Sequence, residues 1–187
     1  MGEYILASQS PRRKQLFQWA EIDFEIMIAD TDESFPEGLS PQEASIYIAR
    51  QKALAIKDKT GTVKTIIAAD TIVVLNHEII GKPKNREDAI AILSRLNGQL
   101  HEVITGVSII ANKEINFCDV TEVSFHTLSH SDIVYYVDQY KPYDKAGAYA
   151  IQEWIGVIGI KSINGDFYNV MGLPVSRVVQ ALKSLKT

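Results

Sequence analysis

The sequence predicts an α/β protein whose mixed, twisted β-sheet is flanked by helices. Strand-like and helix-like patterns alternate along most of the 187 residues, and this alternation is typical of α/β folds. Two long strand candidates, residues 102–111 and 115–125, are separated only by a short polar turn, so they must run antiparallel. We therefore expect a mixed sheet within a single domain that covers residues 1–187.

The first half of the chain combines apolar runs of strand length with two helices that have clear start signals. Ser10 and Ser40 each precede a proline, which suits the first position of a helix, and Glu43 completes a capping box with Ser40. The elements expected here are a strand at 4–7, a helix from Pro11, a strand at 24–28, a helix from Pro41 to about Lys57, strands at 65–69 and 71–75, and a strand at 78–80 after a turn at Asn76-His77.

The second half continues the alternation. Asn85 can cap a helix that ends before Asn97-Gly98, and Asn164-Gly165 is the strongest hairpin signal in the chain. The elements expected here are that helix, the strands at 102–111 and 115–125, a helix that contains residues 133–140 and ends before Pro142, strands at 157–163 and 167–170 on either side of Asn164-Gly165, and a C-terminal helix after Pro174 that buries Val178, Val179 and Leu182.

The composition excludes several classes of function. A net charge of −4 and a pI near 5.6 argue against a nucleic-acid-binding protein, whose surface is normally basic. No apolar run reaches the roughly 18 residues that a membrane span needs, and no signal-peptide pattern precedes the first strand. Cys118 is the single cysteine, which excludes an internal disulfide, and we expect its thiol to lie half-buried in a strand. These features predict a cytoplasmic protein with no membrane or nucleic-acid partner.

The segment Ser8–Lys14 has the features of an anion-binding loop that opens a helix. Unpaired backbone N–H groups and the positive end of the helix dipole are expected in the first turn, where Arg12, Arg13 and Lys14 also lie. Three cations in that position oppose the dipole, so a bound polyphosphate would offset the cost. A solvated basic turn is the alternative, because short basic clusters are common.

Asp70 stands between the apolar runs 66–69 and 72–75. A carboxylate inside such a run must be hydrogen-bonded, paired or metal-bound, because an unpaired charge in a low dielectric is costly. We interpret Asp70 as a functional residue at a strand end that faces a cleft. The structural alternative is an Asx-turn at that strand end, with Thr71 beside it.

Two lysines and a glutamine also occupy positions that could contact a nucleotide. Lys52 lies on a helix face that two isoleucines should bury, where a snorkelling lysine at the edge of the core is the ordinary explanation. Lys82 is held between a glycine and a proline and could reach a phosphate, although most loop lysines do nothing specific. Gln152 could read a base edge through its paired donor and acceptor, but turn packing explains its small-residue segment equally well.

Several common catalytic motifs do not occur in the sequence. There is no Gly-x-x-x-x-Gly-Lys-Ser/Thr loop, no Gly-x-Gly-x-x-Gly and no Gly-x-Ser-x-Gly, and the four histidines show no metal-ligand spacing. P-loop, dinucleotide-binding, serine-hydrolase and zinc-hydrolase chemistry are therefore poor matches. His101 and His126 are expected in ordinary sheet positions.

Taken together, five blocks of the sequence resemble the Maf family of nucleotide pyrophosphatases. They occur in family order from the first strand to the last helix, and they are residues 6–13, 69–71 with 81–83, 144–152, 164–166 and 171–174. The resemblance implies a fold related to the inosine-triphosphate pyrophosphatases and Ham1 proteins, with a cleft between two lobes. It also implies a homodimer, which is the commonest symmetric assembly.

The resemblance further implies hydrolysis of a nucleoside triphosphate to the monophosphate and pyrophosphate, with Mg²⁺ or Mn²⁺. Asp70 looks like the catalytic carboxylate, and Glu33 looks like its metal or water partner. The phosphate-binding positions match Ser8, Arg12, Arg13, Lys52 and Lys82. The base-selecting positions of the branch that acts on dTTP and UTP match Arg12, Thr71 and Gln152.

One position departs from that branch, which typically has glycine after the glutamine where this chain has Glu153. The departure bears on the substrate more than on the reaction. Magnesium prefers one or two carboxylates with phosphate oxygens and waters, and Asp70 with Glu33 would supply the carboxylates. The hypothesis is that Asp70 orients or deprotonates a metal-bound water that attacks the α-phosphorus, after which pyrophosphate leaves.

Two other functions fit the same residues. A nucleotide-binding regulator of cell division would use the pocket without turnover, and a nucleotide phosphatase would release orthophosphate. Modified or damaged nucleotides could also be the biological target. An assay of the products from a panel of nucleoside triphosphates distinguishes these functions.

Overall fold

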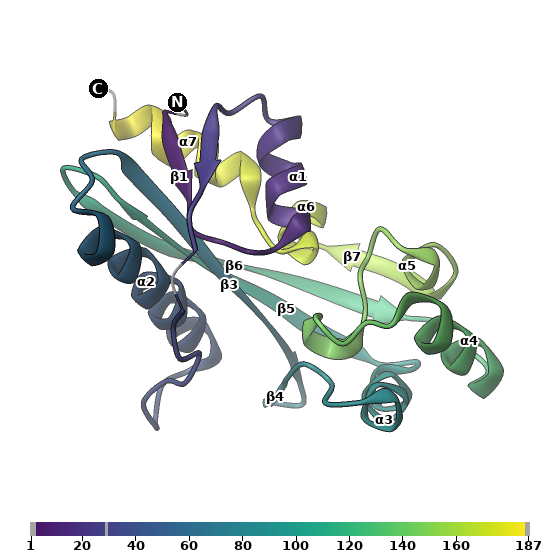
Figure 1. The fold of residues 1–187 in the computed structure, drawn as a ribbon. Helices are drawn as coiled ribbons and strands as arrows, with labels where there is room; N and C mark the ends of the chain where they lie inside the picture. Colours follow the sequence, from purple (N-terminus) through teal and green to yellow (C-terminus); the bar gives the residue numbers. More distant parts are fainter. Residues whose placement is uncertain (1–2, 29, 186–187) are drawn as a thin grey trace. The chain divides into compact units, whose positions relative to one another are not determined.

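A computed structural model describes residues 3–28 and 30–185, and Figure 1 shows its elements. The ends of the predicted domain, residues 1–2 and 186–187, lie outside the described residues. The strands are β1 (Tyr4–Leu6), β2 (Phe24–Ile26), β3 (Thr65–Leu75), β4 (Glu78–Ile80), β5 (Leu100–Ile110), β6 (Glu114–Phe125) and β7 (Ile160–Asn164). The helices are α1 (Pro11–Trp19), α2 (Pro41–Thr60), α3 (Arg86–Leu96), α4 (His130–Tyr140), the 3-10 helix η1 (Ala146–Ala148), α5 (Trp154–Gly159), α6 (Phe167–Met171) and α7 (Val175–Leu185).

The strands form a mixed sheet, as the sequence predicts. Their order is β2-β1-β3-β5-β6-β7, and β4 pairs with β3 outside this path. β1 runs parallel to both β2 and β3, with Ile5 opposite Glu25 on one side and Ile66 on the other. β4 is antiparallel to β3, and β7 is antiparallel to β6. The α/β fold class and the mixed sheet are therefore confirmed.

The chain divides into two compact units. Unit 1 comprises residues up to Thr71, the segment Thr105–Asp119 and the residues from Gly172 onward. Unit 2 comprises Ile72–Ile104 and Val120–Met171. Strands β3, β5 and β6 each contribute residues to both units.

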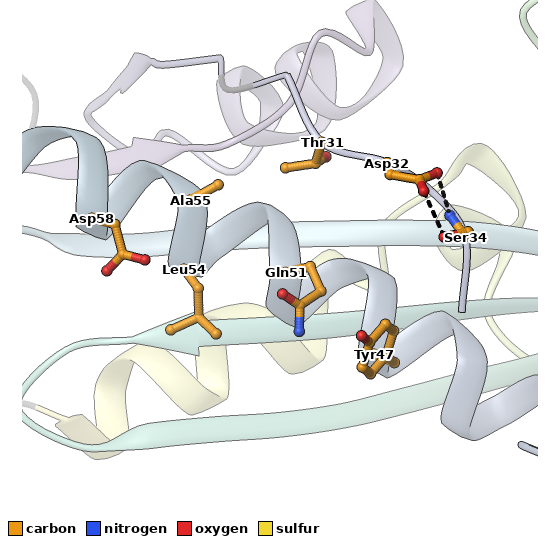
Figure 2. A pocket seen from close by; sticks show the side chains of 8 residues that line it. All are labelled: Thr31, Asp32, Ser34, Tyr47, Gln51, Leu54, Ala55 and Asp58. Atoms are coloured by element: carbon orange, nitrogen blue, oxygen red, sulfur yellow. Dashed lines mark hydrogen bonds between the residues drawn. The ribbon is translucent and has the colours of Figure 1, made fainter. Parts of the chain in front are cut away.

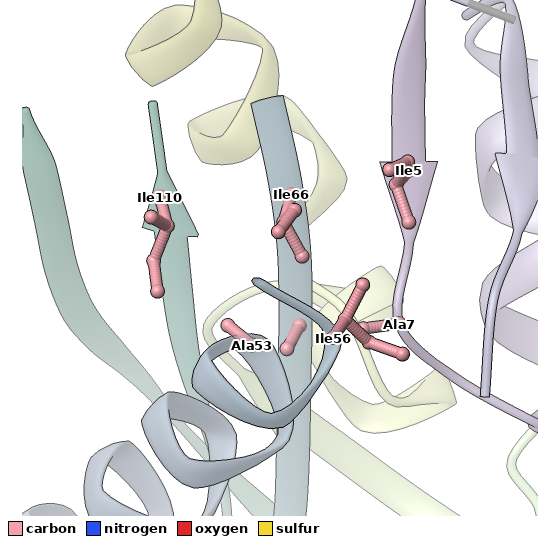
Figure 3. Packing of buried hydrophobic residues seen from close by; sticks show 7 residues of the cluster. Ile5, Ala7, Ala53, Ile56, Ile66 and Ile110 are labelled. Carbon is pink, nitrogen blue, oxygen red and sulfur yellow. The ribbon is translucent and has the colours of Figure 1, made fainter. Parts of the chain in front are cut away.

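The core of unit 1 is built by α2 against three strands. Ala53 and Ile56 project from α2 toward Ile66 of β3, Ile110 of β5 and Ile5 of β1, as Figure 3 shows. These side chains are almost completely buried, so their apolar surface is removed from water, which stabilises the fold by about 25 cal/mol per Å². This packing fixes α2 over the part of β3 that leads to Asp70.

A close backbone contact also joins α2 to β5. Gly106 lies in β5, and a Cβ atom built on it would overlap backbone atoms of Ser45 and Ile46 in α2. Only glycine lets a helix approach a strand this closely.

The predicted helix starts are confirmed at the level of individual hydrogen bonds. The Ser40 hydroxyl accepts from the Glu43 backbone N–H, and the Glu43 carboxylate accepts from the Ser40 backbone N–H at 2.8 Å. Asn85 caps α3 through Asp88, with an N···O distance of 2.9 Å. α2 ends three residues later than predicted, at Thr60, because Gly61 adopts the left-handed conformation that closes the helix.

The predicted hairpin around Asn164-Gly165 is wrong. Residues 154–159 form the helix α5, residues 167–171 form the helix α6, and only Ile160–Asn164 is a strand. That strand pairs with β6, which is distant in sequence, and Gly165 has a φ of +132°. Asp166 then caps α6 by accepting the Tyr168 backbone N–H at 2.7 Å. Asn-Gly therefore forms a turn from strand to helix here.

A second correction concerns β3, which runs unbroken from Thr65 to Leu75. Asp70 lies in the middle of this strand, whereas the sequence suggested a strand end with an Asx-turn as alternative. The strand continues because the carboxylate has a cationic partner and does not need to turn toward solvent.

The expected sheet position of His126 is wrong, because β6 ends at Phe125 and His126 is exposed in the segment that follows. The burial of three other residues was also predicted. Val178 and Leu182 of α7 are buried, while Val179 is half-buried. Cys118 is an unbridged, half-buried thiol in β6, and burial raises its pKa. No helix in the described ranges has both the length and the apolar character that crossing a bilayer requires.

We expect Gly106→Ala to lower the free energy of unfolding by about 1–3 kcal/mol, because the new methyl group would force α2 away from β5. Urea denaturation measures the change. Gly81→Ala is the matched control, since a Cβ there meets nothing within 4 Å, and it should change stability by less than about 0.5 kcal/mol. Equal stability of Gly106→Ala and the wild type would contradict the close-contact interpretation.

Candidate active site

The loop between β1 and α1 adopts the predicted helix-opening conformation. Ser10 is the N-cap of α1, and its hydroxyl accepts the Arg13 backbone N–H at 3.4 Å. The Ser8 hydroxyl accepts the Ser10 backbone N–H at 3.1 Å. Pro11 occupies the first helical position, and the first turn of α1 contains no acidic residue. The positive end of this helix is therefore not neutralised by its own first turn.

Arg13 is buried and makes three hydrogen bonds inside unit 1. Its Nε donates to the Gly172 carbonyl at 2.7 Å, one terminal nitrogen donates to the Thr71 hydroxyl at 2.9 Å, and the other donates to the Ser8 hydroxyl at 3.3 Å. A guanidinium has five N–H groups, so two remain beyond these three bonds. Arg13 thus ties the loop to β3 and to the segment before α7, and it retains donors for an anion.

The charge of Arg13 is shaped by its surroundings. Burial lowers the pKa of the guanidinium from its ordinary value, and the carboxylate of Asp70 acts against that shift. Arg12 lowers the pKa further, and Glu33 raises it. Arginine still stays protonated near neutral pH, so unit 1 holds a largely buried positive charge beside Asp70.

Asp70, Lys52 and Glu33 form an ion-paired group. The Lys52 ammonium lies 2.6 Å from Asp70 Oδ1 and 2.8 Å from Glu33 Oε1. The side chain of Asp70 is 11% exposed and that of Lys52 is 16% exposed, so this pair is mostly removed from water. Lys52 therefore does more than snorkel from the edge of the core: it is the partner that allows a carboxylate inside β3.

Thr71 belongs to a different group of contacts from its neighbour Asp70. Its hydroxyl lies 2.9 Å from the Thr105 hydroxyl and accepts from Arg13, and it donates to the Gly172 carbonyl at 3.4 Å. Consecutive side chains of a strand point to opposite faces, which explains why Asp70 meets α2 while Thr71 meets Arg13. The structure thus brings the candidate residues of unit 1 together as two groups on β3.

The sequence interpretation missed Thr105, which takes part in the hydrogen-bond network of Thr71 and Arg13. It is completely buried in β5, and its hydroxyl contacts Thr71. The available signal was a polar residue within the apolar run 103–110, because a buried hydroxyl normally has a hydrogen-bond partner.

The other two candidates, Lys82 and Gln152, belong to unit 2. Lys82 follows β4 and is exposed, and the Gly81 carbonyl before it accepts the Gly147 backbone N–H at 3.3 Å. Gln152 is exposed in the turn between η1 and α5. Both side chains are therefore accessible to a ligand of unit 2.

The residue before this turn, Tyr149, is anchored in a buried aromatic cluster. His101 Nε2 lies 2.8 Å from the Tyr149 hydroxyl, and both rings meet Phe125 edge to face at about 5 Å. Burial raises the pKa of Tyr149, and it lowers the pKa of His101 to about 4. His101 is therefore a neutral structural residue near pH 7, as its sheet position predicts.

A separate hollow of about 370 Å³ is lined by side chains of residues 31–34 and of α2, as Figure 2 shows. Within it, the Asp32 carboxylate accepts from the Ser34 backbone N–H at 2.9 Å and from the Ser34 hydroxyl at 2.7 Å. The lining residues are Thr31, Asp32, Ser34, Tyr47, Gln51, Leu54, Ala55 and Asp58. Two carboxylates without a cation in this lining make the hollow unsuitable for a polyphosphate.

The donor set of unit 1 fits a divalent cation of the magnesium type. Asp70 and Glu33 already surround one cationic group, the Lys52 ammonium. In the part of the chain that the structure describes, no three His, Cys, Asp or Glu side chains gather as a closed protein site would need. Two carboxylates suit an ion that takes its other ligands from phosphate and water, as Mg²⁺ does.

Comparison with known proteins identifies the family. Residues 3–185 match the family described as Maf-like protein, and the chain belongs to this family. A protein of Parabacteroides distasonis named dTTP/UTP pyrophosphatase is 50% identical, over 96% of this chain and 94% of the relative. A protein of the same name from Cytophaga hutchinsonii is 49% identical, over 98% of this chain and 84% of the relative.

Solved structures confirm the predicted relationship of the fold to Ham1 proteins. A HAM1 protein from Coxiella burnetii matches with a TM-score of 0.50 and 15% identity, covering 98% of this chain and 100% of that one. The Ham1 protein of Staphylococcus aureus matches with a TM-score of 0.50 and 16% identity, covering 98% and 99%. At such low identity the likeness concerns the fold alone.

We expect Arg13→Lys to lower the free energy of unfolding by about 1–3 kcal/mol, because an ammonium cannot reproduce the three bonds of the guanidinium. Arg50→Lys is the matched control. Its exposed pair with Glu114 should contribute less than about 1 kcal/mol. Thermal and urea unfolding measure both changes, and similar losses in the two variants would contradict the structural role of Arg13.

We also expect the stability of the protein to fall between pH 6.5 and about 4 because of His101. In this range the histidine of the unfolded chain is protonated, whereas the buried imidazole of the folded protein stays neutral. The contribution of His101 to the free energy of unfolding is therefore complete above pH 6.5 and is lost as the pH falls toward 4. The loss should reach up to about 3 kcal/mol. Urea unfolding of the wild type and His101→Gln across this range measures it, and parallel pH profiles would show that His101 does not contribute.

Proposed function

We propose that this Maf-like protein is a metal-dependent nucleoside triphosphate pyrophosphatase that hydrolyses dTTP and UTP to the monophosphate and pyrophosphate. The family match and the names of the relatives support the reaction and the substrate. The observation that carries the proposal is Asp70, a carboxylate held by Lys52 within β3, with Glu33 and the charge of Arg13 beside it.

The cations of the chain would bind the phosphates. A nucleoside triphosphate carries about four negative charges, and charge-assisted hydrogen bonds from arginine and lysine neutralise such charges effectively. We assign phosphate binding to the side chains of Arg12, Arg13, Lys52 and Lys82, together with the hydroxyl of Ser8. Arg13 would bind phosphate through the N–H groups that its three internal hydrogen bonds do not use. The same side chain already orients the hydroxyl of Ser8.

Asp70 would act as the general base. Its carboxylate accepts a proton from the attacking water, a new bond forms between the water oxygen and the α-phosphorus, and the bond to the pyrophosphate oxygen breaks. The Lys52 ammonium keeps Asp70 oriented until the phosphates enter. Mg²⁺ or Mn²⁺, held by Asp70 and Glu33, would supply further neutralisation of the phosphate charge.

Base selection would depend on Arg12, Thr71 and Gln152. The paired amide of Gln152 can match the polar edge of uracil or thymine, and a site with paired polar groups rejects a base that leaves them unsatisfied. The Thr71 hydroxyl is engaged by Arg13, Thr105 and Gly172, so its influence would be exerted through that network.

Four further assignments complete the proposal. The chain would act as a single Maf-like domain, which the match over residues 3–185 supports. It would work in the cytoplasm as a homodimer with no nucleic-acid partner, consistent with its unbridged Cys118 and its net charge of −4. Sedimentation of the purified protein tests the dimer directly.

The first experiment is a product analysis with Mg²⁺ and a panel of nucleoside triphosphates, including modified ones. Pyrophosphate with UMP or TMP supports the proposal. Pyrophosphate released from a nucleotide with another base supports the proposed reaction but contradicts the assignment of dTTP and UTP as substrates. Orthophosphate favours the phosphatase, and tight binding without product favours the regulator of cell division.

We expect Asp70→Asn to reduce kcat for dTTP by at least about 100-fold, because the amide cannot accept the proton from water. KM should change far less, since Lys52 and Arg13 remain. Asp58→Asn, an exposed carboxylate at the end of α2, is the matched control and should leave kcat unchanged. Near wild-type turnover by correctly folded Asp70→Asn would remove Asp70 from the mechanism.

A further inference from the structure

The turn that carries Gln152 is held by a buried polar chain within unit 2. Gln152 is exposed, but its neighbours Ala150 and Ile151 are each only 4% exposed. The Glu153 backbone N–H donates to the Ala150 carbonyl at 3.1 Å, which closes the turn around Gln152. One accessible side chain is thus presented by an otherwise buried segment.

Tyr136 of α4 contacts both ends of this turn. Its hydroxyl accepts the Ala150 backbone N–H at 3.2 Å and donates to the Glu153 carboxylate. In the bond with Glu153 the Tyr136 hydroxyl must be the donor, because an ionised carboxylate can only accept hydrogen bonds. Tyr136 is completely buried, so water cannot replace these bonds at the hydroxyl without rearrangement of the core.

Lys145 completes the chain. Its ammonium lies 3.5 Å from the second carboxylate oxygen of Glu153 and 2.8 Å from Asp144, and its side chain is only 9% exposed. Glu153 is therefore held from two directions, by a hydroxyl and by a buried ammonium. Glu153 is also the N-cap residue of α5, and its carbonyl accepts the backbone N–H groups of Gly156 at 2.9 Å and Val157 at 3.2 Å.

We propose that Tyr136, Glu153 and Lys145 are positioning residues that fix the turn around Gln152 and thereby determine base selectivity. The inference rests on the proposed function. It gives a role to Glu153, the position where this chain departs from the glycine typical of the dTTP/UTP branch. A polar group reads a base only if its own orientation is fixed. Here one hydroxyl binds the backbone N–H of Ala150 before Gln152 and the side-chain carboxylate of Glu153 after it.

The test is a double-mutant cycle between Tyr136→Phe and Gln152→Ala. The readout is selectivity, defined as kcat/KM for dTTP divided by kcat/KM for dCTP, which differs at the base edge. Tyr136→Phe should lower selectivity by about fivefold to tenfold when Gln152 is present, and by less than about twofold in the Gln152→Ala background. Amide exchange at Ala150 should become faster in Tyr136→Phe, because its N–H loses its acceptor.

Tyr140→Phe is the matched control, since it removes a hydroxyl from the same helix on a half-exposed ring stacked against Tyr136. It should alter neither selectivity nor exchange at Ala150. If Tyr136→Phe does not fold, Glu153→Gln replaces it. That variant keeps an acceptor for Tyr136 but removes the charge that faces Lys145, and its selectivity should fall in the same Gln152-dependent way.

The outcomes separate this inference from the proposed function. Hydrolysis of dTTP with unchanged selectivity in Tyr136→Phe overturns the positioning role and leaves the function intact. An equal loss with and without Gln152 also overturns it, because the effect would then be a general one on folding. A wild-type protein that hydrolyses none of the nucleotides overturns the function and the inference together.

Discussion

The ion pair between Lys52 and Asp70 is the interaction on which the candidate site depends. β3 is an 11-residue strand with buried residues on both sides of Asp70, and a lone carboxylate there would be costly. The Lys52 ammonium at 2.6 Å offsets this cost, and α2 delivers it because Ala53 and Ile56 fix the helix over β3. Apolar packing of α2 therefore determines where the charge of the site can lie.

Arg13 is a second buried cation of unit 1, and it contacts Thr71, the neighbour of Asp70 in β3. A buried guanidinium is retained because three oxygen atoms of unit 1 accept its hydrogen bonds. The chain as a whole has a net charge of −4, yet unit 1 concentrates Arg13 and Lys52 next to its catalytic candidate. Positive charge is therefore concentrated locally in an acidic protein, whereas the hollow beside α2 is lined by two carboxylates and no cation.

In unit 2 the candidate base-reading residue is oriented by its neighbours. Its exposed candidate, Gln152, lies in a turn that is held through the hydrogen bonds of Tyr136 with the adjacent residues Ala150 and Glu153. This separates the residue that would contact the base from the residues that orient it. A substitution in the supporting chain can therefore alter recognition without touching the substrate.

Local signals carried much of the fold prediction. The caps at Ser10, Ser40 and Asn85 depend on neighbours within three residues, so the sequence is sufficient to place them. The hairpin at Asn164-Gly165 was wrong because the same dipeptide suits two turns, and the choice was made by pairing of β7 with the distant β6. Likewise, nothing local indicated that β3 would continue through Asp70.

The sequence by itself determined the fold class, the starts of the helices that carry caps and the set of candidate site residues, since periodicity, caps and unusual charges are local properties. Tertiary structure decided which of those residues meet. It paired Lys52 with Asp70 across 18 positions and Arg13 with Thr71 across 58, and it brought Thr105 and Tyr136 into supporting roles. Such contacts arise only when distant segments pack together, because the energy of burying a charge depends on the partner that packing brings to it.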